Sequence, residues 1–262
     1  MKPLTEISLF SGIGGFSLAA ERLGIETIQH VEIDRNAQLV LKDNFPNVPL
    51  HDDIRTFHPI HRGANLYTIG FPCTQTSNAG DRTGLTGAES SLWFEALRCI
   101  VEGEPAFVVI ENPTGLIDRG LRAVLGGLRM AGYYWESPTI LSAAMLGAPH
   151  RRERVFIIAY ADRLRWQKQP CGWAEQVRSM VQEKRSCGTW PQFKRGDNGA
   201  VTRLPAFLDT VPIEVQLSVA NGTEGRIKSR VLFGRSVVPA VAEIPLRRVL
   251  ALAECVEDIY NF

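Results

Sequence analysis

Short apolar runs alternate with helix-like segments along the first 160 residues of the chain. Runs of strand length include TEISLF at 5–10, ANLYTIGF at 64–71 and RVFIIAY at 154–160, and amphipathic segments such as SSLWFEALRCIVEGE at 90–104 separate them. Strands that alternate with helices of about 10 to 15 residues are typical of a parallel sheet with helices on both faces. The sequence therefore predicts an α/β fold.

Length, charge and cysteine content limit the class of protein. The chain has 262 residues, 45% of them hydrophobic and 22% charged, which is enough for a substantial core. A net charge of +1 leaves any nucleic-acid contact to local basic clusters. Five cysteines without a CxxC pair argue against a disulfide framework or a metal site. Without a signal peptide or an apolar run of about 18 residues, we expect a cytoplasmic protein with no membrane span.

The pattern changes after Tyr160. Residues 161–215 are rich in Arg, Lys, Gln and Trp, show weak periodicity and contain no obvious core helix. Periodic apolar residues return at 236–256, where a helix must pack on something. We therefore predict a first domain at 1–160, a small irregular lobe at 161–230, and a C-terminal segment at 231–262 that returns to the first domain.

Residues suited to chemistry follow the predicted strands in order. They are the turn SGIGG at 11–15, then Glu32 and Asp34, then Asp53, Cys73 and Glu111. Ligands of open α/β sheets bind at the carboxyl ends of the strands. A glycine turn that opens a helix, with an acid about twenty residues later, can bind a nucleotide. Because GIGG lacks the GxGxxG spacing, an adenosine-bearing ligand without a pyrophosphate fits better than a dinucleotide.

Each of three features could have an ordinary structural role instead of a chemical one: Cys73, Glu111 and the basic run HRRER at 150–154. A free cysteine is most often a buried apolar thiol, but polar neighbours and a strand-end position favour a nucleophile at Cys73. Glu111 either faces water or acts as a general acid, since it ends the apolar run AFVVI. The basic run is either a solvated cluster or a site for anions and base edges.

Together these segments resemble the DNA cytosine-5 methyltransferases. LFSGIGGFSLA at 9–19, VEID at 31–34 and DDI at 52–54 are similar to the three cofactor motifs of that family. GFPCTQTSNAG at 70–80 is similar to the nucleophile motif and ENPTGL at 111–116 to the glutamate motif. APHRRERVFIIAY at 148–160 is similar to the arginine motif, and LFGRSVVPAVAEI at 232–244 to the late motif. The resemblance covers nearly all of the chain outside roughly residues 163–215.

The resemblance implies a class I, Rossmann-like fold that uses S-adenosyl-L-methionine and no metal. It implies methyl transfer to carbon 5 of a flipped-out cytosine in double-stranded DNA by a monomer. Cys73 would add to carbon 6, Glu111 would protonate N3, and Arg152, less directly Arg154, would hold the carbonyl oxygen of the base and the neighbouring backbone. The implied cofactor residues are Phe10, Ser11, Gly12, Ile13, Gly14, Gly15, Glu32, Ile33, Asp53, Ile54, Pro72, Leu92 and Ser236.

The resemblance also gives the three predicted parts their roles. The first domain would hold the catalytic and cofactor sites, the lobe would recognise the target, and the C-terminal segment would complete the cofactor side. Two alternatives stay open at this point. Relatives of this fold modify tRNA, and Arg235 stands where the family normally has Asn, which would suit a DNA-binding relative with weakened catalysis. A nicotinamide dehydrogenase is a distant third.

Overall fold

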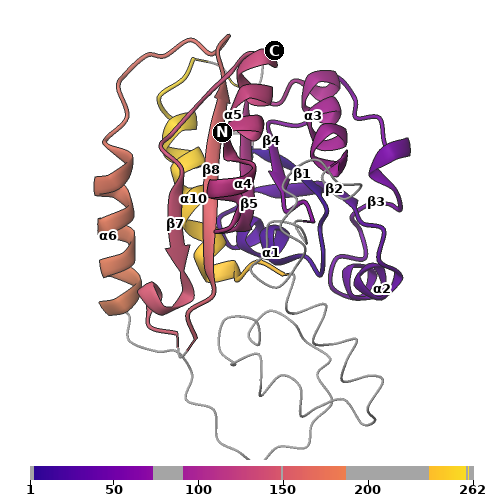
Figure 1. Cartoon of the computed structure of the whole chain (residues 1–262), viewed down its shortest axis with the longest axis horizontal. Coiled ribbons are helices and arrows are strands. Elements are labelled where there is room, and N and C mark those ends of the chain that lie inside the picture. Colours follow the sequence, from indigo (N-terminus) through magenta and orange to yellow (C-terminus); the bar gives the residue numbers. More distant parts are fainter. Residues whose placement is uncertain (1–2, 73–90, 149, 187–235, 258, 260–262) are drawn as a thin grey trace, which may run out of the picture.

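A computed structural model of the chain describes residues 3–72, 91–148, 150–186, 236–257 and 259. The strands of this part form one eight-stranded sheet in the order β3-β2-β1-β4-β5-β8-β6, and β7 also pairs with β8 (Figure 1). The strands are β1 (Thr5–Leu9), β2 (Glu26–Val31), β3 (Leu50–His51), β4 (Leu66–Ile69), β5 (Phe107–Pro113), β6 (Tyr133–Trp135), β7 (Thr139–Ser142) and β8 (Glu153–Ala161).

Helices cover both faces of this sheet. The α-helices are α1 (Gly15–Arg22), α2 (Arg35–Asn44), α3 (Ser91–Gly103), α4 (Leu116–Arg119), α5 (Leu121–Met130), α6 (Trp173–Ser186) and α10 (Pro239–Ala253), and η1 (Ile54–Thr56) and η3 (Ala143–Leu146) are 3₁₀ turns. On one face α1 packs along α10, and on the other α3 packs with α5 (Figure 1). The α/β prediction is confirmed.

The prediction of a parallel sheet is wrong at one side. β1 to β5 are parallel, but β8 runs antiparallel to β5, with Glu111 opposite Phe156 and Pro113 opposite Arg154. Only the short segment 143–152 connects β7 to β8, whereas a parallel neighbour would need a crossover of a dozen or more residues. The start of β8 therefore lies at the same edge of the sheet as the carboxyl end of β5.

A buried polar network ties the first strands together beneath α1. Glu6 on β1 is fully buried, and its carboxylate accepts hydrogen bonds of 2.5 Å from the hydroxyls of Thr27 and Thr68. Ser17 of α1 bonds the ring of His30 at 2.9 Å. Burial raises the pKa of Glu6 and lowers the pKa of His30 to about 4. Hydrogen bonds to buried polar groups offset the cost of their burial, so the network fixes β1, β2 and β4 in register.

The expectation that 161–215 contains no core helix is wrong for α6. Trp173, Val177 and Met180 of this helix are buried in the main core. The buried Arg248 of α10 donates to the carbonyl oxygen of Cys171 and to Gln176 Oε1, both at 2.8 Å. The few apolar residues of α6 are separated by many charged ones, so the helical periodicity was not recognised in the sequence. The division of the chain at residue 161 stays a prediction, and residues 187–230 of the expected lobe lie outside the described part.

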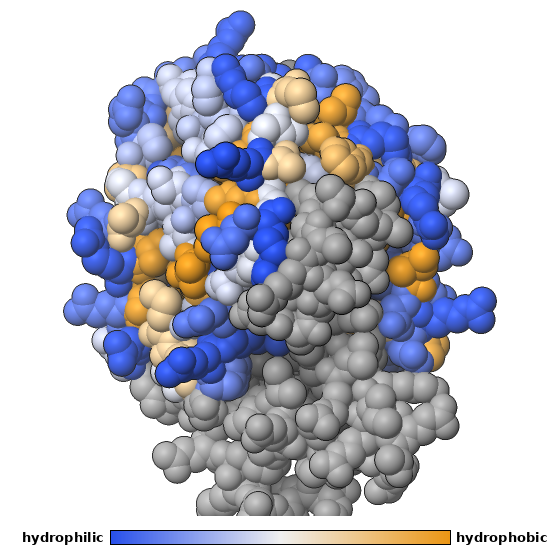
Figure 2. Space-filling view, in the orientation of Figure 1, coloured by the Kyte–Doolittle hydropathy of each residue, from blue (hydrophilic) through white to orange (hydrophobic). Residues whose placement is uncertain are grey.

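The surface of the described part is largely polar. The face in Figure 2 is mostly hydrophilic, and its apolar side chains form small groups between charged ones. No helix among the described residues is both long enough and apolar enough to cross a membrane.

Candidate active site

The glycine turn after β1 is held rigidly by its own polar groups. The Ser11 hydroxyl donates to the carbonyl oxygen of Ser8 at 2.8 Å and accepts from the backbone N–H of Val31 at 3.1 Å. Gly12 and Gly14 have φ values of 55° and 88°, which favour glycine. A Cβ on Gly12 would meet nothing within 4 Å, so the backbone at this one position of the turn faces open space. Ile13 is buried.

Glu32 joins this turn to the end of β2. Its two carboxylate oxygens accept from the backbone N–H groups of Gly12 at 2.7 Å and of Asp34 at 2.8 Å. Burial raises the pKa of Glu32. The side chain of Ile33 is 60% exposed beside it, which is unusual for an isoleucine next to a sheet end. Each carboxylate oxygen keeps a lone pair for a further donor, so Glu32 can also accept from a diol.

Asp53 begins the short turn η1 and is already engaged by a neighbour. It caps the backbone N–H of Arg55 at 3.0 Å and forms an ion pair of 2.8 Å with the guanidinium of Arg55, which lowers the pKa of Asp53. Ile54 is buried. Arg98 of α3 donates to the carbonyl oxygen of Ile54 at 2.7 Å and to that of Phe57 at 3.0 Å. Arg98 thus fixes the turn through its backbone carbonyl groups, a contact that no sequence pattern indicated.

Two residues at the start of the C-terminal segment pack against the glycine turn. A Cβ on Gly15 would lie 2.5 Å from the carbonyl oxygen of Val237 and 3.0 Å from Ser236 Oγ. Ser236 is buried, and its carbonyl oxygen accepts from the guanidinium of Arg152. This close approach therefore requires glycine at position 15. Arg235 lies outside the part of the chain that the structure describes.

Glu111 and Arg154 form the charged centre of this edge. Glu111 lies near the end of β5 and is 5% exposed, and Arg154 Nε lies 2.8 Å from Glu111 Oε1. The antiparallel course of β8 brings Arg154 there. Burial raises the pKa of Glu111, and the charges of Arg154 and Arg152 oppose that rise. Arg154 thus forms an ion pair with Glu111, a contact that the sequence did not predict.

Arg152 is held in an unfavourable position. Its backbone φ of 38° lies in the left-handed region that side chains rarely adopt. Burial and the neighbouring Arg154 lower the pKa of Arg152 to about 10. The surrounding contacts, including the one to Ser236, keep it there. Strained and desolvated cations of this kind are common at ligand sites.

The chain that leads to Cys73 is anchored beside Glu111. Asn112 is fully buried and donates from Nδ2 to the carbonyl oxygen of Phe71 at 3.1 Å. Phe71 is buried against Trp93, with ring centroids 5.6 Å apart. Cys73 itself is outside the described residues, whereas Pro72 is half-buried at the end of this anchored segment. Asn112 stands within ENPTGL, but no pattern indicated that it binds the backbone at Phe71.

The remaining predicted cofactor residues line the same edge. Phe10 has a positive φ of 55° and packs partly against the core, and Leu92 is half-buried at the start of α3. A Cβ on Gly70 would lie 3.7 Å from the carbonyl oxygen of Phe10 and 3.8 Å from Glu111 Oε2. Gly70 therefore sits between the glycine turn and the acid, so the two halves of the candidate site are adjacent.

The chain matches the family described as C-5 cytosine-specific DNA methylase over residues 4–207. It belongs to this family. Type II methyltransferase M.HpaII of Haemophilus parainfluenzae is 34% identical over 165 residues, which are 60% of this chain and 46% of that protein. M.HhaI of Haemophilus parahaemolyticus is 31% identical over 162 residues, 60% of this chain and 49% of that protein. The chain spans about half the length of these curated relatives.

Solved structures share the fold of this chain. A DNMT2 mutant of Spodoptera frugiperda has a TM-score of 0.61 at 14% identity and covers 95% of this chain and 100% of its own. The Dnmt2 methyltransferase of S. pombe has a TM-score of 0.54 at 21% identity, with 67% of this chain and 55% of its own covered. The class I methyltransferase fold is thus confirmed, and identities this low carry no more than the fold.

Gly15→Ala should both destabilise the protein and weaken cofactor binding. The added Cβ would overlap the backbone of Val237, which cannot rotate away. We expect a loss of about 1–3 kcal/mol in the free energy of unfolding, the usual cost of overpacking. Gly126→Ala is the matched control, since a Cβ there meets nothing within 4 Å and alanine favours the helix. Urea denaturation and calorimetric titration with S-adenosyl-L-methionine measure the two effects. Equal stability of the two variants would contradict the close approach.

Proposed function

We propose that this chain transfers a methyl group from S-adenosyl-L-methionine to carbon 5 of cytosine in double-stranded DNA. The observation that carries the proposal is the buried Glu111–Arg154 pair beside the anchored segment that leads to Cys73. Membership of the C-5 cytosine-specific DNA methylase family supports it. A buried acid and a desolvated arginine lie at one sheet edge, next to the segment that precedes Cys73 in the sequence, and this combination suits nucleophilic addition to an electron-poor ring.

The residues at the first three strand ends fit an adenosine-bearing cofactor. Glu32 would accept hydrogen bonds from the ribose hydroxyls, and the exposed side chain of Ile33 would pack against the adenine. The open backbone around Gly12 leaves room for the methionine part. Asp53, with Ile54, would face the adenine edge. Bound S-adenosyl-L-methionine supplies an electrophilic methyl group.

The chemistry on the base depends on residues of this chain. Carbon 5 of cytosine is too electron-poor to attack a methyl donor directly. Addition of the Cys73 thiolate to carbon 6, with proton donation from Glu111 to N3, makes carbon 5 nucleophilic. Loss of the proton from carbon 5 after methylation then allows elimination of the thiolate. Arg154 would orient Glu111 and, with Arg152, hold the carbonyl oxygen of the base.

The base must leave the DNA stack to reach this edge. Recognition of the surrounding sequence is assigned to the predicted lobe, most of which follows α6. Two basic residues of this predicted lobe bind the body of the protein: Arg163 donates to the carbonyl oxygen of Glu104 at 2.6 Å, and Lys184 pairs with Glu243. The base readers are therefore expected after residue 186.

Methyl transfer to duplex DNA and to tRNA, measured side by side with tritiated S-adenosyl-L-methionine, tests the proposal. We expect incorporation into DNA only, and incorporation into tRNA only would favour the RNA alternative. Duplex DNA that carries 5-fluorocytosine should trap a covalent complex, because fluorine blocks the loss of a proton from carbon 5. Binding of that DNA without a trapped complex would indicate a relative with weakened catalysis.

A further inference from the structure

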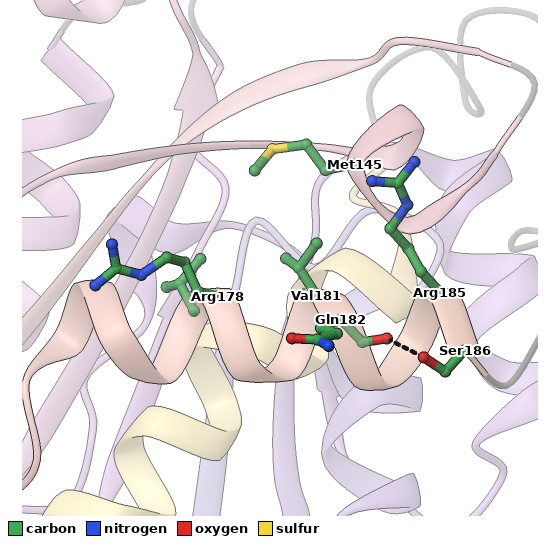
Figure 3. Close-up of a pocket in the computed structure, with 7 residues that line it drawn as sticks. Met145, Arg178, Val181, Gln182, Arg185 and Ser186 are labelled. Atoms are coloured by element: carbon green, nitrogen blue, oxygen red, sulfur yellow. Dashed lines mark hydrogen bonds between the residues drawn. The ribbon is translucent and has the colours of Figure 1, made fainter.

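A groove at the carboxyl end of α6 is lined by two arginines. It has a volume of about 360 Å³ and lies between α6 and the η3 turn (Figure 3). Its lining residues are Met145, Val177, Arg178, Val181, Gln182, Arg185 and Ser186. Arg178, Gln182 and Arg185 are exposed on one face of the helix. Figure 3 shows the two guanidinium groups extending from the helix on either side of Gln182.

These two arginines differ from the charged residues around them. Lys184 pairs with Glu243, and Glu183 pairs with Arg247 at 3.3 Å. In the ranges that the structure describes, neither Arg178 nor Arg185 forms an ion pair or a hydrogen bond. Glu175 lies one helical turn before Arg178 but does not line the groove. The groove thus presents two positive charges that are available to a ligand.

The groove lies at the same edge of the sheet as the candidate active site. β7 pairs antiparallel with β8, so β7 is parallel to β5 and its carboxyl end, Ser142, reaches the edge where Glu111 lies. η3 follows at once, and the Ser142 hydroxyl accepts from the N–H of Met145 at 3.2 Å. α6 packs on η3. The groove lies beside β7, and β8 separates β7 from β5, the strand of Glu111. A polymer bound over Glu111 would therefore also pass over the groove.

We infer that Arg178 and Arg185 contact phosphates of the DNA backbone beside the methylation site. The inference rests on the proposed function, because it requires DNA at this edge. Seven residues of α-helix place the two arginines about 10 Å apart along the helix axis, and one DNA strand carries a phosphate about every 3.4 Å of its axis. Each guanidinium can thus take a different phosphate of one strand. Such contacts position the duplex without reading its sequence.

The salt dependence of DNA binding tests this inference. Each phosphate contact contributes about 0.9 to the slope of log K against log salt, so Arg178→Gln/Arg185→Gln should reduce the slope by about 1.8. Between 50 and 200 mM salt, the wild-type protein should then lose about 12-fold more affinity than the double variant. Fluorescence anisotropy with a labelled duplex measures both proteins. The single variants should each show about half of the change in slope.

Arg129→Gln is the matched control for charge. Arg129 lies at the end of α5, with its guanidinium 4.4 Å from the ring centroid of Tyr134, at the opposite edge of the sheet. For Arg129→Gln, the slope of log K against log salt for DNA binding should equal that of the wild-type protein. All variants should keep wild-type affinity for S-adenosyl-L-methionine, which reports an intact fold.

An unchanged slope for the double variant would overturn the inference even if the protein methylates DNA. A reduced slope seen with tRNA but not with DNA would also overturn it and would assign the groove to RNA. A reduced slope with DNA, in a protein that transfers no methyl group, would support the groove while contradicting the proposed function. The two proposals can therefore fail separately.

Discussion

Cys73→Ser should abolish methyl transfer to DNA and leave the affinity for S-adenosyl-L-methionine nearly unchanged. A serine hydroxyl does not ionise near neutral pH, whereas a thiol can supply the thiolate that adds to carbon 6. The cofactor contacts expected at Glu32 and the glycine turn do not involve position 73. Single-turnover assays with saturating DNA measure the first effect and calorimetric titration the second.

The other cysteines provide the controls for this experiment. Cys171 is exposed and free, so Cys171→Ser should keep full activity. Cys99 is buried, and burial raises its pKa to about 12, which makes it a poor nucleophile at neutral pH. Turnover by Cys73→Ser at the wild-type rate would contradict the assignment. Failure of that variant to form a trapped complex with 5-fluorocytosine DNA, while Cys171→Ser forms one, would support it.

The sequence predicted the sheet edge well because that edge has a local signature. Each of the first five strands is followed by glycine, acid or cysteine residues, and the alternation with helices required those ends to meet. Glu32, Glu111 and the glycine turn accordingly lie at one edge, and the late segment returns to Gly15. These features depend on neighbours along the chain or on patterns with fixed spacing.

The features that the sequence did not predict depend on tertiary pairing. The run RVFIIAY reads the same whether β8 is parallel or antiparallel, and only the short connection from β7 decides it. That direction brings Arg154 to Glu111, a pairing that was not predicted. α6 shows few apolar residues because only one narrow side contacts the core. Arg98 and Asn112 bind backbone carbonyl oxygens, which no residue pattern reveals.

The environment of Glu111 predicts how its protonation varies with pH. Burial raises the pKa of Glu111 above the usual 4.5, and the charge of Arg154 limits that rise. A raised pKa keeps the acid protonated to higher pH, and the acid is lost as pH rises through that pKa. The thiolate of Cys73 has the opposite requirement, since it forms as pH rises. The rate of transfer should therefore rise and then fall with pH, and the falling limb should belong to Glu111.

Glu111→Gln should slow methyl transfer by roughly 10²-fold or more, the scale of general acid catalysis. Glutamine keeps the shape of the side chain but cannot give N3 a proton. The variant should also lose the falling limb of the pH–rate profile, since that limb records loss of the Glu111 proton. Single-turnover rates measured from about pH 5 to about pH 9 test both effects, because the pKa values of catalytic acids and bases are tuned toward neutral pH.

Controls must separate lost chemistry from lost structure, because Glu111→Gln leaves the guanidinium of Arg154 without its buried partner. Glu153→Gln removes an exposed carboxylate at the start of β8, next to Arg154, and should keep the wild-type rate. The double variant Glu111→Gln/Arg154→Gln removes both charges of the pair, so it should regain stability in urea denaturation but not activity. If the double variant regained the wild-type rate, the slow transfer of Glu111→Gln would reflect the unpaired charge, and Glu111 would not be the proton donor. A wild-type rate in the single variant at saturating DNA would lead to the same conclusion.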